Sequence, residues 1–190
     1  MSAEQGTGHP LARRLVAVLA TVLVVLAGMI GLLLFFNGRD DAGVSSSAGP
    51  GREFPDLGAR HLQPGERPPV AYNASPPVSG AHVPRLPTSD DATLSDDQLL
   101  HALELGNVVL VHGGARGGNP PAPLMKIAED LSGPFDPALV GGGQAVIIAR
   151  RPGVRGVLAL AWRHQLAAPT ATDPRLGEFA EYWLGRGAGT

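Results

Sequence analysis

The chain has 190 residues, which is room for one domain of ordinary size and a membrane anchor. Its 15 basic and 17 acidic residues give a formal net charge of −2, and the sequence contains no basic cluster typical of nucleic-acid-binding proteins. Because cysteine is absent, disulfides, thiolate metal sites and cysteine nucleophiles are excluded.

Residues 15–36 form an uncharged, apolar stretch near the N-terminus. As a helix it would reach about 33 Å, enough to cross a hydrocarbon core of roughly 30 Å. Arg13 and Arg14 precede the stretch, which places residues 1–14 in the cytoplasm by the positive-inside rule. The alternative, a cleaved signal peptide, typically has a shorter apolar run of about 7–15 residues. The sequence therefore predicts a single-pass protein of the cell membrane, with the rest of the chain outside the cytoplasm.

Composition divides the remainder into a linker and a domain. Residues 37–58 are rich in Gly, Ser, Asp and Pro, which predicts a flexible linker. The extracytoplasmic domain is then expected over residues 59–190. Its first part, residues 59–92, contains many prolines and is expected to wrap the surface in extended segments and turns.

A helix is predicted directly after this proline-rich part. Ser95 and Gln98 have the spacing of a capping box, in which each side chain bonds the other residue's amide. Leu99 and Leu103 belong to its apolar stripe, and Gly106 suits the position just after its end.

The following segments predict a small α+β domain with a three- to four-stranded sheet and about three helices. Continuous apolar runs at 107–112 and 144–149 indicate buried strands, and 156–162 is expected to return as a hairpin partner of the second strand. Helices are expected at 122–131 and from Pro174 to about residue 184.

Three groups of residues carry a resemblance to a known family. They are His61 to Pro84, with Tyr72-Asn73 and the run 76–82; His101 to Gly106, followed by Val108-Val109; and 151–154 with 161–163, Gln165-Leu166 and 173–176. From Arg60 to the C-terminus the chain resembles the bacterial family called domain of unknown function 3105, as a partly degenerate member. The resemblance implies a single-pass protein with an exported domain. Leu105 stands where the family has histidine, and Arg163 where it has glycine.

One constellation suggests a metal site. His101 and Glu104 are three residues apart on the predicted helix and therefore share a face. Loop histidines folded over that face could complete a set of nitrogen and oxygen ligands, which suits Zn²⁺ or Cu²⁺. The candidate ligands are His61, His82, His101 and Glu104. The alternative is that these histidines bond backbone carbonyls and hold the proline-rich part against the helix.

Other candidate sites have simpler interpretations. Ser79 and Ser132 lack the spacing of a catalytic triad, and the glycine-rich residues 113–119 lack the Gly-Lys-Ser/Thr of a phosphate loop. His112 and His164 are expected to be polar residues at strand ends. Aspartates near the first helix suit turns and caps, and they lack the pattern of a calcium loop: Asp90, Asp91, Asp96 and Asp97.

Two functions remain open from the sequence. The favoured one is a membrane-anchored extracytoplasmic binding or interaction domain, and the alternative is a copper- or zinc-binding envelope protein. An enzyme is the least favoured class. The membrane is the one partner that the sequence predicts, and no protein partner can be named.

Overall fold

The computed structural model describes residues 49–114 and 119–189. The predicted cytoplasmic segment 1–14, the predicted membrane helix 15–36 and most of the predicted linker lie outside these residues. Among the helices that are described, none combines the length and the apolar character needed to cross a membrane.

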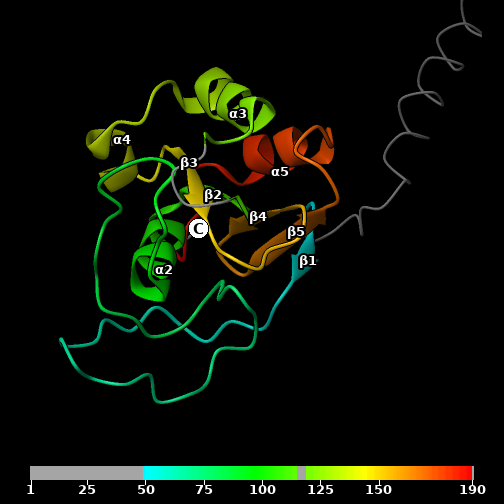
Figure 1. The fold of residues 1–190 in the computed structure, drawn as a ribbon. Helices are drawn as coiled ribbons and strands as arrows, with labels where there is room; N and C mark the ends of the chain where they lie inside the picture. Colours follow the sequence, from blue (N-terminus) through cyan, green and yellow to red (C-terminus); the bar gives the residue numbers. More distant parts are fainter. Residues whose placement is uncertain (1–48, 115–118, 190) are drawn as a thin grey trace, which may run out of the picture. The chain divides into compact units, whose positions relative to one another are not determined.

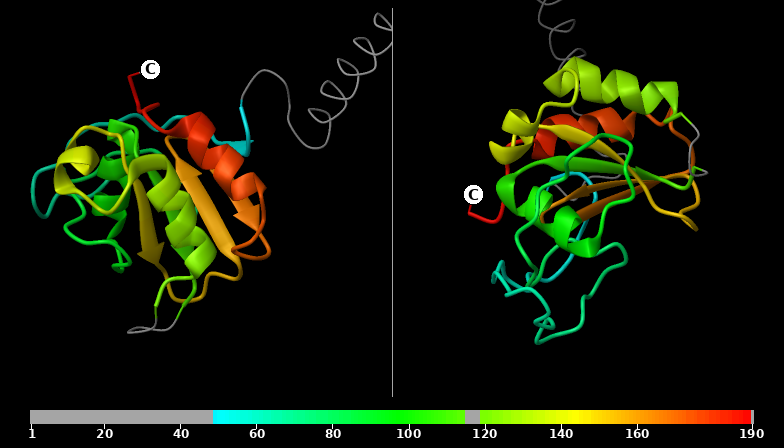
Figure 2. Two further views of the ribbon diagram at one scale, coloured as in Figure 1. Left: turned by 90° about the horizontal axis from the view of Figure 1, so that it is seen from above. Right: turned by 60° about the vertical axis from the view of Figure 1, so that its left-hand side comes forward.

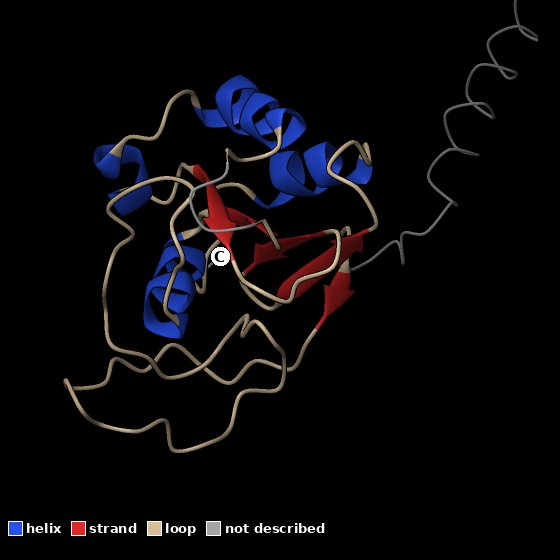
Figure 3. Ribbon diagram, in the orientation of Figure 1, coloured by secondary structure: helices blue, strands red, loops and turns tan. Residues whose placement is uncertain are grey.

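The centre of the domain is a mixed five-stranded sheet (Figures 1 and 3). Its strands are β1 (Arg52–Glu53), β2 (Val108–His112), β3 (Val146–Arg150), β4 (Val157–Ala161) and β5 (His164–Ala168). They lie in the order β1-β5-β4-β2-β3. Strands β2 and β3 are parallel, and the other neighbours are antiparallel. The α+β class is thus confirmed, with more strands than the sequence predicted.

Helices cover both faces of the sheet, as Figure 2 shows. They are α2 (Asp96–Leu105), α3 (Ala122–Ser132), α4 (Pro137–Gly141) and α5 (Arg175–Trp183). Helices α3 and α5 pack together on one face, and α2 packs with α4 on the other.

Strand β2 builds both halves of the core. Val109 and Val111 belong to the cluster that contains the buried leucines of α2. Val108 and Leu110 belong to the opposite cluster, with Leu124 of α3 and Phe179 of α5. Successive side chains of a strand point to opposite faces. An apolar run without alternation is therefore needed here, and the prediction of burial on both faces is confirmed.

The sequence predicted the position of α2 correctly from the residues at its two ends. Ser95 and Gln98 form the predicted capping box, and Gly106 ends the helix with φ 111°, a conformation that favours glycine. Helices α3 and α5 also lie close to their predicted positions.

The predicted hairpin between the second and third strands is wrong. Strand β2 lies between β3 and β4, and the connecting segment passes its end, where the amide of Arg151 donates to the carbonyl of His112. The hairpin partner of β4 is instead β5, joined to it by a two-residue turn at Trp162 and Arg163.

The residues before the proline-rich part and the last residues of that part are tied to opposite edges of the sheet. Residues 52–54, inside the range predicted as flexible linker, pair with β5 and with the carbonyl of Arg163. At the opposite edge, residues 90–92 run along β3, where Ala92 forms a parallel bridge with Ala149. The segment between these contacts runs over the surface, as predicted, and lies on the α2 side of the sheet (Figure 1).

Candidate metal centre

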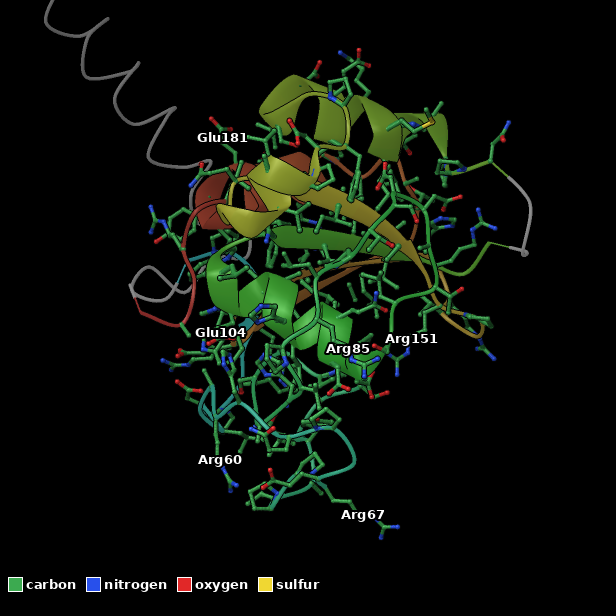
Figure 4. All side chains as sticks on the ribbon, turned by 90° about the vertical axis from the view of Figure 1, so that its left-hand side faces the viewer. Arg60, Arg67, Arg85, Glu104, Arg151 and Glu181 are labelled. Atoms are coloured by element: carbon green, nitrogen blue, oxygen red, sulfur yellow. The ribbon has the colours of Figure 1, made fainter. Side chains whose placement is uncertain are left out.

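The four predicted ligands meet on the outer side of α2. His101 and Glu104 come from the last two turns of this helix. His61 and His82 come from the proline-rich part, where they form a parallel bridge with each other. Figure 4 shows Glu104 on the side of α2 that faces the segment carrying Arg60. His61, His82, His101 and Glu104 are called the His/Glu cluster below.

Backbone hydrogen bonds hold the two loop histidines in register. The amide of Leu62 donates to the carbonyl of His82 at 2.8 Å, and the amide of His82 donates to the carbonyl of Arg60 at 3.1 Å. The amide of Val83 donates to Oδ1 of Asp97 on α2 at 3.0 Å. These bonds place both imidazoles over the helix without help from their side chains.

One carboxylate oxygen lies at the middle of the cluster. Oε2 of Glu104 is 2.9 Å from Nε2 of His61 and 3.1 Å from both Nε2 of His82 and Nδ1 of His101. One nitrogen from each ring and this oxygen all lie within 4.8 Å of one another. The ring centroids form a nearly equilateral triangle with sides of 5.4, 5.4 and 5.5 Å.

These separations suit a four-coordinate ion. With metal–ligand bonds of about 2.0–2.1 Å, the ligand atoms of a regular tetrahedron lie about 3.3 Å apart. Three observed separations, and the 3.5 Å between Nε2 of His82 and Nδ1 of His101, are close to this value. The other separations among the four ligand atoms are at most 4.8 Å, so the side chains would draw closer together around an ion.

Burial differs sharply between the histidines. The side chain of His82 is fully buried, that of His101 is 15% exposed, and that of His61 is 49% exposed. The cluster is thus closed on the protein side and reachable from solvent past His61.

The tautomer of His82 follows from its partner. Its Nδ1 lies 2.9 Å from the carbonyl oxygen of Gly80, which can only accept, so Nδ1 carries the proton. In the neutral ring Nε2 then carries the lone pair, and it lies 3.1 Å from Oε2 of Glu104 and 3.5 Å from Nδ1 of His101. A metal-binding histidine commonly donates its other N–H to a backbone carbonyl in this way.

The histidines of the cluster keep the carboxylate of Glu104 ionised. Burial alone would raise the pKa of Glu104, but hydrogen bonds from His61 and His101 and the charges of His61 and His82 together hold that pKa below its ordinary value. The carboxylate is therefore ionised at neutral pH. It also lies near the C-terminus of α2, where the helix dipole favours positive charge.

The remaining candidates from the sequence have structural partners. Ser79 accepts from the amide of Leu57, and Ser132 accepts from the amide of Val146. His112 and His164 lie at the ends of β2 and β5, as expected. The aspartates serve as bond acceptors or ion-pair partners: Asp90 for Ile148, Asp91 for His112 and Arg150, Asp96 for Arg151, Asp97 for Val83.

The alternative from the sequence, that the histidines bond backbone carbonyls, holds for His82, although Gly80 was not predicted as its partner. The two residues are two apart, a spacing at which a side chain readily bonds a backbone group in a turn. Gly80 itself has φ 134°, which a glycine adopts without strain.

Comparison with known proteins gives one match. A family described as "Protein of unknown function (DUF3105)" matches residues 62–188, a range that contains His82, His101 and Glu104. His61 lies one residue before the matched range. No curated protein and no solved structure matches the chain.

Proposed function

The chain belongs to the DUF3105 family of proteins of unknown function, and on that premise we propose that its domain binds a divalent transition-metal ion through the His/Glu cluster. The observation that carries the proposal is the convergence of one nitrogen from each of His61, His82 and His101 with a carboxylate oxygen of Glu104, all within 4.8 Å of one another. Nδ1 of His82 donates to the carbonyl of Gly80, so its Nε2 is the nitrogen that can offer a lone pair to an ion. Neutral imidazoles and an ionised carboxylate are the forms in which these side chains bind a metal ion.

The donor set favours Zn²⁺ or Cu²⁺. Imidazole nitrogens suit both ions, and a carboxylate oxygen completes the set. Cu⁺ prefers thiolates and thioethers. The chain has no cysteine, and Met125 belongs to α3, on the opposite face of the sheet from the cluster.

The proposed location is the outer surface of the cell membrane. Residues 15–36 would anchor the domain, and the arginines before them would keep the N-terminus in the cytoplasm. Metal handling would then take place close to the membrane. The proposed membrane-anchored binding domain does not depend on which of the two metals is bound.

Metal titration tests the proposed site. Full-length protein, purified in detergent and stripped with a chelator, is titrated with Zn²⁺ and with Cu²⁺ by calorimetry. We expect one ion per chain, and His82→Ala and His101→Ala should each weaken binding strongly. His112→Gln is the matched control, because His112 is buried outside the cluster. Wild-type protein that binds neither ion at roughly 100 μM, or cluster variants that bind as wild type does, would refute the proposal.

Membrane extraction tests the proposed anchor separately. The full chain should remain with the membrane at alkaline pH, whereas a variant lacking residues 15–36 should be released. Protease added to intact cells or inverted vesicles then reports the side on which the domain lies. Cleavage of the domain only from the cytoplasmic side would contradict the proposed orientation.

A further inference from the structure

A second hollow lies away from the His/Glu cluster, between the β4–β5 turn and the C-terminal tail. Its volume is ≈ 370 Å³, within the range of small-molecule sites. The residues that matter for its chemistry are Asp56, Trp162, Arg163, His164, Trp183 and Arg186. This hollow is called the Trp/Arg pocket below.

Aromatic rings form much of its wall. The ring of His164 stacks on Trp183 with 3.8 Å between centroids. The indole N–H of Trp183 donates to the carbonyl of Pro50 at 2.8 Å. By contrast, Trp162 is only 5% exposed, and among the described residues its indole N–H has no hydrogen-bond partner. Buried donors without partners are rare, and such a group commonly indicates an unseen partner.

Two arginines line the same pocket. The guanidinium of Arg186 lies over the Tyr182 ring at 4.1 Å and pairs with no carboxylate in the described part of the chain. Arg163 uses one terminal nitrogen for Glu53, while its buried Nε has no hydrogen-bond partner within residues 49–114 and 119–189. Arginine presents planar donors that suit carboxylates.

The backbone of Arg163 is held in an unfavourable conformation. Its φ is 65°, in the left-handed region where glycine is favoured over residues with a Cβ. Strained residues of this kind cluster at functional sites. The two-residue turn between β4 and β5 requires such a positive φ, so glycine can replace Arg163 here without disturbing the turn.

Glu53 already pairs with Arg163, so Arg186 is the cation of the pocket that is left without a carboxylate among the described residues. Oδ1 of Asp56 accepts from the amide of Gly58 at 2.8 Å, which occupies part of this carboxylate. A ligand with a charged end and an apolar body matches the combination of arginines and aromatic rings better than an inorganic anion does.

We infer that the Trp/Arg pocket binds a small organic carboxylate. The carboxylate lies at the guanidinium groups of Arg186 and Arg163, and the apolar body lies against the aromatic wall near Trp183. This site is independent of the proposed metal site, so neither depends on the other being correct.

The chain provides its own probe, because its two tryptophans both line the pocket. Full-length protein in detergent, with a chelator present, is titrated with benzoate while tryptophan emission is followed with excitation at the red edge. Benzylamine has the same ring with the opposite charge, and inorganic phosphate has charge without an apolar body. We expect a saturable response to benzoate, and a weak or linear response to the other two.

Two substitutions separate binding from folding. Arg186→Gln removes an exposed cation from the tail, and should weaken benzoate binding about tenfold. Arg163→Gly relieves the left-handed backbone, so it should weaken benzoate binding while the thermal midpoint stays the same or rises. Lys126→Gln, which removes an exposed cation on α3, is the control.

The outcomes are decisive in both directions. A saturable benzoate response that both arginine variants weaken and the lysine variant leaves unchanged supports the site. The inference is overturned by the absence of a saturable response, by an equal response to benzylamine, or by unchanged affinity in both arginine variants.

Discussion

The amide of Ala188 donates a hydrogen bond to the backbone carbonyl of Glu104, with 2.9 Å between nitrogen and oxygen. The residue whose carboxylate lies at the middle of the His/Glu cluster thus also fastens the C-terminal tail. A second bond, from the amide of Gly185 to the carbonyl of Gly106, fixes the start of the tail at 2.8 Å. The end of α2 therefore supports both the proposed metal site and one wall of the Trp/Arg pocket.

Gly106→Ala should destabilise the domain by about 2–3 kcal/mol. The residue has φ 111°, and an added Cβ would lie 2.9 Å from the carbonyl carbon of Gly185. Gly177→Ala is the matched control, since a Cβ at this helical position meets nothing within 4 Å. It should stabilise by about 0.5–1 kcal/mol. Urea unfolding of both variants measures the two effects, and the same sign in both would contradict this account.

Glu104→Gln should weaken metal binding by more than roughly a hundredfold, because loss of an outer-sphere partner alone costs 10–100-fold. The substitution keeps the size of the side chain but removes the negative charge among three imidazoles. Competition with a chelator of known affinity measures the change. Glu129→Gln, on α3 away from the cluster, should leave the affinity unchanged.

The stability of the domain should fall on mild acidification, partly through His112. Burial lowers the pKa of this residue below its ordinary value of 6.5. Its Nδ1 accepts from the amide of Gly114, and its Nε2 donates to Asp91, so the neutral ring is fully bonded. As pH falls through about 6.5, the unfolded chain takes up a proton before the folded one does. The contribution of neutral His112 to the free energy of unfolding is therefore fully present above about pH 6.5. It is lost as the pH falls toward the pKa of His112 in the folded protein.

The predicted loss of stability at lower pH is tested by measuring the free energy of unfolding at pH 7.5 and at pH 5.5. The measurement is made for wild type and for His112→Gln. Glutamine can still donate toward Asp91 but does not titrate. The difference between the two pH values should be smaller in the variant. An equal or larger difference would show that other groups set the pH dependence.

Phe179→Ala should cost about 3–5 kcal/mol, because the ring is fully buried between α5 and the sheet. Tyr182→Ala on the same helix is the comparison. Tyr182 is 39% exposed, so its loss should cost about 1 kcal/mol. Thermal unfolding with detection by circular dichroism distinguishes the two, and comparable losses would mean that α5 contributes little to the core.

The elements that the sequence predicted are those with strong local signals. Helix α2 has a capping box at one end and a glycine at the other, and β2 is a continuous run of apolar residues. Strand β5 was missed because His164–Ala168 combines small and polar residues, and its turn lacks the usual Asn-Gly or Asp-Gly. Strand β1 has two residues and helix α4 has five, so tertiary contacts determine both.

The cluster could be predicted only in part. The spacing of His101 and Glu104 on one helix is a local property that the sequence states directly. The positions of His61 and His82 over the helix depend on backbone bonds between two segments about twenty residues apart. Such a pairing leaves no periodic pattern in the sequence from which it could be predicted. Residue type and helix spacing suggest these four residues, and their convergence is a property of the fold.

The segment that runs along β3 has a consequence for how copies of this domain behave beside one another. The amides of Ile148 and Arg150 already bond Asp90 and Ala92, and the carbonyl of Ile148 accepts from Asp91. An extended peptide from a neighbouring molecule therefore finds these edge groups occupied. A vacant sheet edge promotes pairing with another chain and aggregation. Residues 90–92 thus prevent another chain from pairing with β3 at this edge.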